Sequence, residues 1–253
     1  YWDAYFDFTK VQSPDADVNI FMNGWSPYQA KVAFDIGRVT SFYYWGIGRG
    51  FGFRDTSQDT IAITISAPEK AKSRILLLAR QMQSDGKVYH HFFGDGQGEF
   101  TRHCDDPLWF ILAVTDYIRE TGDFDLLNLS EPFTDGRSGS ILDHLLSVVT
   151  FVRGNLGKHG LPVFGRGDWN DTLDYIGGTD GGESVWGGMF YVAMLNLLTD
   201  LLERIGRADL KAGRDPHAPP PSLSHPVPAA PPPCRAQLVL QRHGPPTQHR
   251  VAE

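Results

Sequence analysis

The chain of 253 residues is poor in cysteine, in basic charge and in long apolar runs. Its two cysteines, Cys104 and Cys234, cannot build a disulfide framework. A formal net charge of −7 provides no basic surface for phosphate-backbone contacts, so the sequence predicts no nucleic-acid partner. No apolar run reaches the roughly 18–20 residues that a membrane span needs, so we expect no membrane partner either.

The start of the chain lacks targeting features. Tyr1-Trp2-Asp3 contains no initiator Met and none of the basic and apolar regions of a signal peptide. We therefore expect a cytoplasmic protein, or one clipped at its start. Residues 1–28 are mixed and turn-rich, and we expect them to be a connector to a domain that precedes them.

Residues 29–210 are expected to form the globular part. Ser66-Ala67-Pro68-Glu69 predicts a capping box for one helix, and Asp106-Pro107 predicts an N-cap and a first-turn proline for another. Further helices are expected over about 141–156 and 184–205. The helix over 184–205 is apolar on two sides, which predicts that both sides pack against other elements.

Two weaker helical patterns complete the expected fold. They cover residues 29–45 and 54–65, although Ile-Ala-Ile-Thr-Ile at 61–65 could also form a strand. About six helices joined by long loops predict an all-α architecture. Long loops without secondary structure of their own are usually functional or disordered, and these carry glycines, acids and aromatics.

The end of the chain has a different composition. Eleven of the 17 prolines follow residue 215, in runs such as Pro219-Pro220-Pro221 and Pro231-Pro232-Pro233. Such a stretch neither forms helices nor buries a core, so residues 211–253 are predicted to be a disordered, low-complexity tail. A natural linker would have this composition. We favour a wrong reading frame or an assembly error, because the globular pattern stops within a domain.

A tryptophan flanked by acids forms the first candidate site, Asp168-Trp169-Asn170-Asp171. An indole can cover the apolar face of a pyranose while Asp and Asn bind its hydroxyls. A carboxyl group desolvated by that ring favours its protonated form, which suits a general acid. A helix N-cap after a glycine turn is the alternative interpretation. That alternative does not explain why both acids flank Trp169.

A glycine-rich loop over residues 46–55 is the second candidate. Phe51 and Phe53 stand where a dinucleotide loop requires its third glycine, and the Gly-Lys-Ser/Thr of a phosphate loop is missing. The loop does offer Arg49, Arg54 and a carboxylate, which suit contacts with anions and with vicinal hydroxyls. An Arg–Asp surface pair on a glycine turn is the alternative.

Histidines and acids form two further clusters, His90-His91 and His103-Cys104-Asp105-Asp106. Their spacing matches no zinc pattern, and Asp106 is expected to cap a helix. We therefore predict no metal, and assign these groups to hydrogen bonds that support a sugar pocket.

These groups suit the cleavage of a glycosidic bond and leave its nucleophile open. An inverting hydrolase needs an acid and a carboxylate base that activates water, for which Asp168 and Asp105 are candidates. A phosphorylase needs only the acid, because phosphate is itself the nucleophile and arginines hold it. Three arginines in or near the glycine loop favour phosphate: Arg38, Arg49 and Arg54.

Four long motifs occur in order along the chain. They are Trp25-Ser26-Pro27-Tyr28-Gln29, residues 46–59, residues 105–109, and His159-Gly160-Leu161-Pro162 leading to residues 168–171. Over about residues 20–208 this succession resembles the catalytic domain of glycoside hydrolase family 94, the cellobiose, chitobiose and cellodextrin phosphorylases. The resemblance implies about half the helices of an (α/α)6 barrel, which a β-sandwich domain precedes in the family.

The resemblance also implies a role for each site residue. Asp171 would be the general acid, Arg49, Asp55 and Trp169 would bind sugar in the −1 subsite, and Arg38 would contact phosphate. We therefore predict inverting phosphorolysis of a β-linked gluco-disaccharide or oligosaccharide to α-glucose 1-phosphate. Inorganic phosphate is the co-substrate, neither metal nor organic cofactor is implied, and a homodimer of the intact enzyme is compatible with this prediction.

The sequence departs from the family pattern in ways that affect activity. No β-sandwich domain is present, and the later His and Thr that hold phosphate in the family have no counterpart in the tail. We expect these 253 residues alone to be inactive, with apolar faces exposed on helices such as 184–205. An inverting hydrolase on the same barrel and an inactive fragment that binds sugar through Trp169 are the alternatives. Gly182-Glu183-Ser184-Val185-Trp186 is also similar to a domain of cyclic β-1,2-glucan synthases, so the linkage stays open.

Overall fold

The computed structural model describes residues 1–7, 10–38, 50–94, 96–173 and 181–210. The proline-rich tail and Arg49 lie outside these described residues. The described chain is mostly helical and carries two small antiparallel sheets. The expected all-α architecture is therefore corrected to a mostly helical one with two small sheets.

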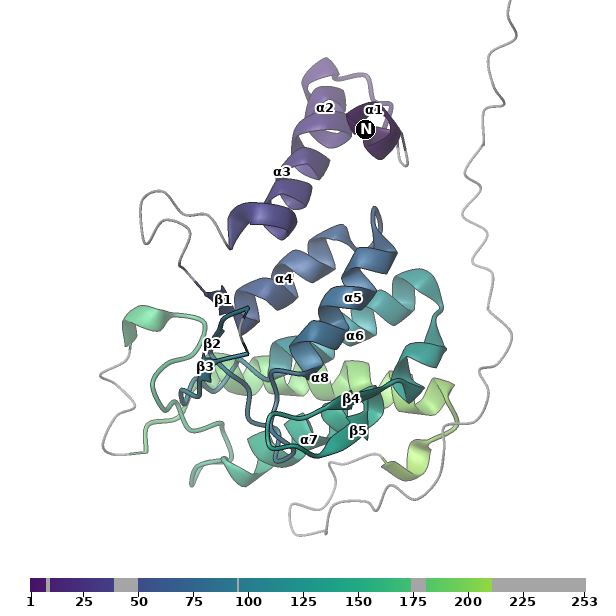
Figure 1. Ribbon diagram of the computed structural model, residues 1–253. Helices are drawn as coiled ribbons and strands as arrows, with labels where there is room; N and C mark the ends of the chain where they lie inside the picture. The colour runs from purple at the N-terminus through teal and green to yellow at the C-terminus, as the bar shows by residue number, and fades with distance from the viewer. Residues whose placement is uncertain (8–9, 39–49, 95, 174–180, 211–253) are drawn as a thin grey trace, which may run out of the picture.

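The N-terminal segment is more helical than the sequence predicted. Its elements are α1 (Trp2–Phe6), α2 (Ala16–Ile20) and α3 (Ser26–Val32), with π-helical turns at Phe21–Trp25 and Ala33–Gly37. Asp15 starts the second of these helices, because its side chain accepts hydrogen bonds from the backbone N–H groups of Asp17 and Val18. Figure 1 shows these helices at one end of the molecule. The turn-rich character expected for residues 1–28 is therefore not observed.

Five longer helices build the core. They are α4 (Phe53–Ile63), α5 (Pro68–Ala79), α6 (Leu108–Thr121), α7 (Ile141–Gly154) and α8 (Val185–Arg204). As Figure 1 shows, α4 packs against α5 and α6, and α6 packs in turn against α8. The largest buried side chains between them include Phe53, Ile75, Leu78, Phe110, Ile111 and Ile141. Residues 54–63 are thus helical, and the alternative of a strand at 61–65 is not observed.

Both predicted helix caps are wrong, although the helices themselves are present. α5 begins after Ala67, which provides no side-chain cap, and the hydroxyl of Ser66 instead lies 2.8 Å from that of Tyr5. α6 begins after Pro107, and the carboxylate of Asp106 contacts His90 at 2.8 Å. Asp106 does not cap because its side chain is directed toward the site described below.

The long helix α8 is buried on one side. Tyr191, Met194, Leu198 and Leu202 lie in the core, whereas the exposed side carries Val185, Met189 and Val192, each more than half exposed. Packing on both sides, as the sequence predicted, is therefore not seen among the described residues. By length and composition alone α8 could cross a membrane, but its buried side makes it a core helix of this fold.

The two sheets are short and join loops. β1 (Phe51–Gly52), β2 (His91–Phe92) and β3 (Gly98–Glu99) pair in that order, and β4 (Ser130–Pro132) pairs with β5 (Ser138–Ser140). In the first sheet Phe51 lies opposite Phe92, and the two rings stack at 5.4 Å. This pairing places the first turn of α4 beside the histidine-containing loop.

Candidate active site

Arg54, in the first turn of α4, joins the loops that carry the predicted site residues. Its Nη2 donates to both carboxylate oxygens of Asp171, at 2.8 and 2.9 Å. Its Nη1 donates to Oδ2 of Asp105 at 3.2 Å and to the carbonyl oxygen of Asp168 at 3.0 Å. Burial alone would lower the pKa of Arg54, but the charges of Asp105 and Asp171 outweigh burial and raise it. Arg54 is therefore a permanent cation at the centre of the site.

Asp105 anchors this arginine from inside the protein. Its side chain is fully buried, and its Oδ2 also accepts a hydrogen bond from the indole nitrogen of Trp109 at 3.0 Å. Burial raises the pKa of Asp105, while the neighbouring Arg54 opposes that effect. Trp109 lies in the first turn of α6 and Asp105 just before that helix, where its carbonyl accepts a hydrogen bond from the backbone N–H of Leu108.

The two acids of the Asp-Trp-Asn-Asp motif have different surroundings. Asp168 is buried, and its oxygens accept hydrogen bonds from the Ser184 hydroxyl at 2.7 Å and the Asn170 backbone N–H at 2.9 Å. The side chain of Asp171 is 58% exposed, and Trp169 is 56% exposed. Two side chains this exposed do not desolvate each other. The desolvation of the acid by Trp169 that the sequence suggested is therefore not observed. Arg54, not the indole, dominates the environment of Asp171.

Two glycines allow this loop to approach its neighbours. Gly165 has a φ of +64°, and a Cβ there would lie 2.0 Å from the carbonyl oxygen of Arg102. A Cβ at Gly167 would lie 2.8 Å from a ring carbon of His103. The backbone N–H of Cys104 also donates to the carbonyl of Gly167 at 3.0 Å. The Gly-Arg-Gly sequence therefore brings the loop of residues 168–171 against His103.

A pair of histidines lies beside Asp171. Nε2 of His103 is 3.7 Å from Oδ1 of Asp171, and its Nδ1 is 2.6 Å from the hydroxyl of Thr101. The ring of His90 stacks on that of His103, with centroids 3.9 Å apart, and its Nδ1 contacts Asp106 at 2.8 Å. Burial lowers the pKa of both histidines and raises that of Asp106 well above its usual range.

The same cluster was considered for a metal. One ligand atom from each of His90, His103 and Asp106 can be chosen so that all lie within 4.8 Å of one another. His90 and Asp106 already contact each other, and the two rings are nearly parallel, at 7°, so their nitrogens do not converge on one point. Arg54 adds a positive charge nearby, which disfavours a cation. The arrangement fits hydrogen-bonding support better than a metal centre, and the absence of a metal stays a prediction.

The predicted phosphate ligand Arg38 contacts one of the predicted sugar ligands, Asp55. Nη1 of Arg38 is 3.2 Å from Oδ1 of Asp55, and Arg38 also forms a two-pronged contact with Asp59 at 2.7 and 3.0 Å. Burial would lower the pKa of Arg38, but the hydrogen bonds that Arg38 donates to Asp59 and the charge of Asp55 raise it. Asp55 follows Arg54 directly, so one helical turn links these residues to Asp171.

Sequence reasoning missed the central role of Arg54. Arg54 was counted only as one of three arginines that favour phosphate, and its contact with Asp171 spans 117 residues of sequence. Ser184 was also missed, although it caps α8 through the backbone N–H of Gly187 at 2.8 Å while its hydroxyl donates to Asp168. Its position in the Gly-Glu-Ser-Val-Trp motif was the available signal.

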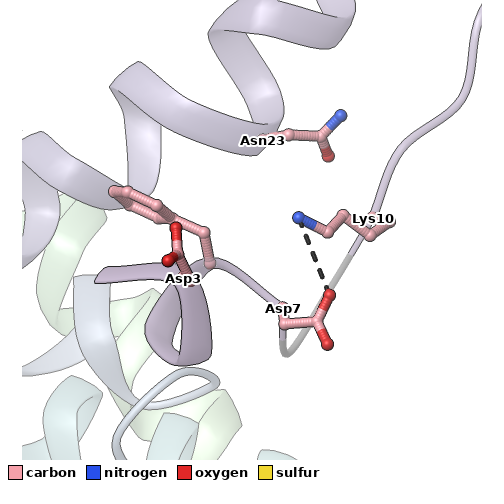
Figure 2. A pocket seen from close by; sticks show the side chains of 5 residues that line it. Asp3, Asp7, Lys10 and Asn23 are labelled. Carbon is pink, nitrogen blue, oxygen red and sulfur yellow. Dashed lines mark ion pairs between the residues drawn. The ribbon is translucent and has the colours of Figure 1, made fainter. Parts of the chain in front are cut away.

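A hollow of about 530 Å³ lies elsewhere, on the N-terminal helices. Figure 2 shows Asp3, Asp7, Lys10 and Asn23 around it. Its ion pair, Lys10 with Asp7, spans 3.8 Å between two exposed side chains. Such a surface pair contributes little, and the hollow contains none of the site residues described above.

Comparison with known proteins identifies the family of the chain. Residues 1–214 match the model of the glycosyl hydrolase 94 superfamily, catalytic domain. The chain is 33% identical to solabiose phosphorylase of Paenibacillus borealis over 204 residues, which cover 78% of the chain and 24% of that protein. It is 28% identical to N,N'-diacetylchitobiose phosphorylase of Vibrio proteolyticus over 233 residues, 82% of the chain and 29% of that protein.

A third relative is the cyclic beta-(1,2)-glucan synthase NdvB of Rhizobium meliloti, 32% identical over 77% of the chain and 8% of that protein. The chain thus spans about a quarter of the length of the two phosphorylases it matches. The fold of this family implies that the helices described above form part of an (α/α)6 barrel. The chain belongs to the glycosyl hydrolase 94 superfamily and carries sequence of its catalytic domain.

Proposed function

We propose that the intact protein phosphorolyses a β-linked gluco-disaccharide or oligosaccharide with inversion and releases α-glucose 1-phosphate. Asp171 acts as the general acid, and phosphate is the nucleophile. Two relatives from the same family are named as disaccharide phosphorylases, which supports this reaction class. Neither a metal nor an organic cofactor takes part.

The observation that carries the proposal is the contact between Arg54 and Asp171. It holds an exposed carboxyl group in a fixed position at the edge of a buried, charged cluster. Exposure lets this carboxyl group reach the leaving oxygen, and the arginine orients it, which are two of the properties that a general acid needs. Asp171 is the exposed acid that Arg54 fixes in this way among the described residues.

The surroundings of the other acids argue against an inverting hydrolase. The second carboxylate of such an enzyme lies about 6.5–9.5 Å from the acid. It holds a water on the opposite face of the sugar. Asp168 is buried and uses both oxygens in hydrogen bonds, and Asp105 is fully buried against Arg54 and Trp109. Neither candidate base is free to activate water.

The remaining roles follow from the cluster around Arg38. Arg38 supplies positive charge for phosphate once substrate displaces Asp55, which then accepts hydrogen bonds from sugar hydroxyls. Asp59 keeps Arg38 in place during this exchange. Trp169, more than half exposed, covers the apolar face of the sugar, and Arg49 binds the sugar in the same subsite.

Product analysis tests the proposal. The intact protein is incubated with a panel of β-glucosyl disaccharides, with and without phosphate, and the products are followed by proton NMR. We expect α-glucose 1-phosphate to appear only with phosphate. Free glucose formed equally well without phosphate would identify a hydrolase, and sugar binding without any turnover would identify the inactive binding protein.

A further inference from the structure

Arg74, in the middle of α5, is a partly buried cation that the site described above does not use. Its Nη2 donates to the backbone carbonyl of Phe34 at 3.3 Å. Its other amino nitrogen, Nη1, is buried and meets no hydrogen-bond acceptor among the described residues. Burial lowers the pKa of Arg74, and the charge of Asp59 opposes that effect. A buried N–H group without an acceptor costs free energy of folding, so Nη1 is a donor in reserve.

The guanidinium of Arg74 lies over two aromatic rings, which hold it in place. Its Cζ is 4.1 Å from the ring centroid of Phe34 and 5.6 Å from that of Phe51. Phe34 belongs to the π-helical turn that ends just before Arg38, and Phe51 lies in β1, which leads into α4. The helix α4 carries Asp59 and packs against α5. Arg74 is therefore fixed beside the elements that carry Arg38 and its partner Asp59.

Arg38 cannot bind phosphate without giving up contacts that it now makes. Its Nη1 contacts Asp55 at 3.2 Å, its Nη2 donates to Oδ1 of Asp59 at 3.0 Å, and its Nε donates to Oδ2 at 2.7 Å. A guanidinium holds phosphate with two parallel N–H groups, and Nη1 and Nη2 are the pair that leaves Nε with Asp59. The side chain of Asp55 is 35% exposed and can meet water or a sugar hydroxyl, but that of Asp59 is only 8% exposed. Oδ1 of this buried carboxylate then needs another donor.

We propose that Asp59 changes partners when phosphate binds, and that Nη1 of Arg74 takes the place of Nη2 of Arg38 at Oδ1. The proposal rests on the proposed function, in which Arg38 contacts phosphate. The contact of Nε with Oδ2 persists, so Asp59 keeps orienting Arg38 while both carboxylate oxygens stay paired. Arg74 touches no substrate and acts through Asp59 and Arg38, so it is a positioning residue.

The test measures the KM for phosphate and the KM for the disaccharide in the intact protein with Arg74→Met. Methionine fills the space beside the two rings but carries neither a charge nor a donor. We expect the phosphate KM to rise about fivefold or more, because one acceptor of a buried carboxylate is left unpaired. The KM for the disaccharide and kcat at saturating phosphate should stay within about twofold of wild type. The matched control is Arg80→Met, since Arg80 lies at the C-terminal end of the same helix and pairs with Glu131 instead.

A double-mutant cycle with Asp59→Asn tests whether Arg74 acts through that carboxylate. In this background no buried charge needs a new donor, so adding Arg74→Met should change the phosphate KM by less than about twofold. An equal rise in both backgrounds, or an equal rise in the KM for both substrates, would show a structural role and overturn the proposal. If Arg74→Met does not fold, Arg74→Gln keeps an amide donor for the carbonyl of Phe34, and the same cycle with the same outcomes applies to it.

Failure of the proposed function gives a different result from failure of the partner exchange. A wild-type protein without phosphate-dependent activity would refute the proposed function, and the exchange with it. A wild-type protein that consumes phosphate, with a phosphate KM that Arg74→Met leaves unchanged, would refute the exchange alone.

Discussion

The two ends of the loop of residues 168–171 carry the same side chain in opposite surroundings. Asp168 is buried and accepts hydrogen bonds from Ser184 and from the Asn170 backbone. Asp171 is mostly exposed, and Arg54 and His103 approach it from one side. One end of the loop is attached to the start of α8, and the other faces solvent. The comparison shows how one short motif places one acid in the interior and another at the surface.

The difference comes from the partners, not from the motif itself. Ser184 caps α8 and donates to Asp168 with the same hydroxyl group, so the loop moves with that helix. Arg54 is fixed by Asp105 and offers its second amino group to Asp171. An acid that uses both oxygens in buried hydrogen bonds cannot also give up a proton to substrate. The exposed side of Asp171 is open to a substrate, because Arg54 contacts it from the protein interior.

The largest expected effect is that of Asp171→Asn on turnover. Without a proton donor the sugar must leave as an alkoxide, so the variant should lose about 10²–10⁴-fold in kcat on a natural disaccharide. Stability should change less than in Asp168→Asn, because the side chain is mostly exposed and Asp105 still pairs with Arg54. Steady-state kinetics and a thermal melt of the intact protein measure both quantities. A variant with nearly full activity would remove Asp171 from the chemistry.

Arg38→Ala should affect one substrate more than the other. Arg38 supplies positive charge beside Asp55, so its loss should raise the KM for phosphate about tenfold or more while the KM for disaccharide changes far less. Initial rates with each substrate varied in turn separate the two constants. Equal effects on both would assign Arg38 to structure or to sugar binding, through its contact with Asp59.

Asp168→Asn tests the structural role of the buried acid. An amide cannot accept both hydrogen bonds as a carboxylate does, so the variant should lose about 1–3 kcal/mol of stability. Urea unfolding of the intact protein measures this loss, and Ser184→Ala is the partner variant, expected to show a similar change. If Asp168→Asn unfolds like wild type but is inactive, the structural role assigned to Asp168 is wrong.

The smallest expected effect concerns the dependence of stability on pH. His144 is fully buried and stacks on Phe133 at 3.8 Å, and burial lowers its pKa. The unfolded state then binds more protons than the folded state below about pH 6.5, so stability falls as pH falls through this range. Melts from about pH 7 to pH 5 should show the loss, and His144→Phe should reduce its slope. An unchanged slope would contradict this assignment.

The sequence predicted some parts of this account better than others. The helices α6, α7 and α8 were predictable because apolar residues recur at helical spacing, and the motif at residues 168–171 marked the loop that contacts Arg54. The contact of Arg54 with Asp105 spans 51 residues of sequence and that with Asp171 spans 117, so no local pattern encodes either. The predicted cap at Asp106 failed for the same reason, because its partner His90 is distant in sequence.

The most direct test of the central claim compares Asp171→Asn with Asp168→Asn on 2,4-dinitrophenyl β-glucoside. Phosphate-dependent release of dinitrophenol is followed alongside turnover of the natural disaccharide. We predict that the loss caused by Asp171→Asn nearly disappears on the activated donor, because its leaving group needs no proton. The loss caused by Asp168→Asn should be the same on both donors. If the pattern is reversed, the two acids exchange roles, and if neither variant depends on the leaving group, Asp171 is not the general acid.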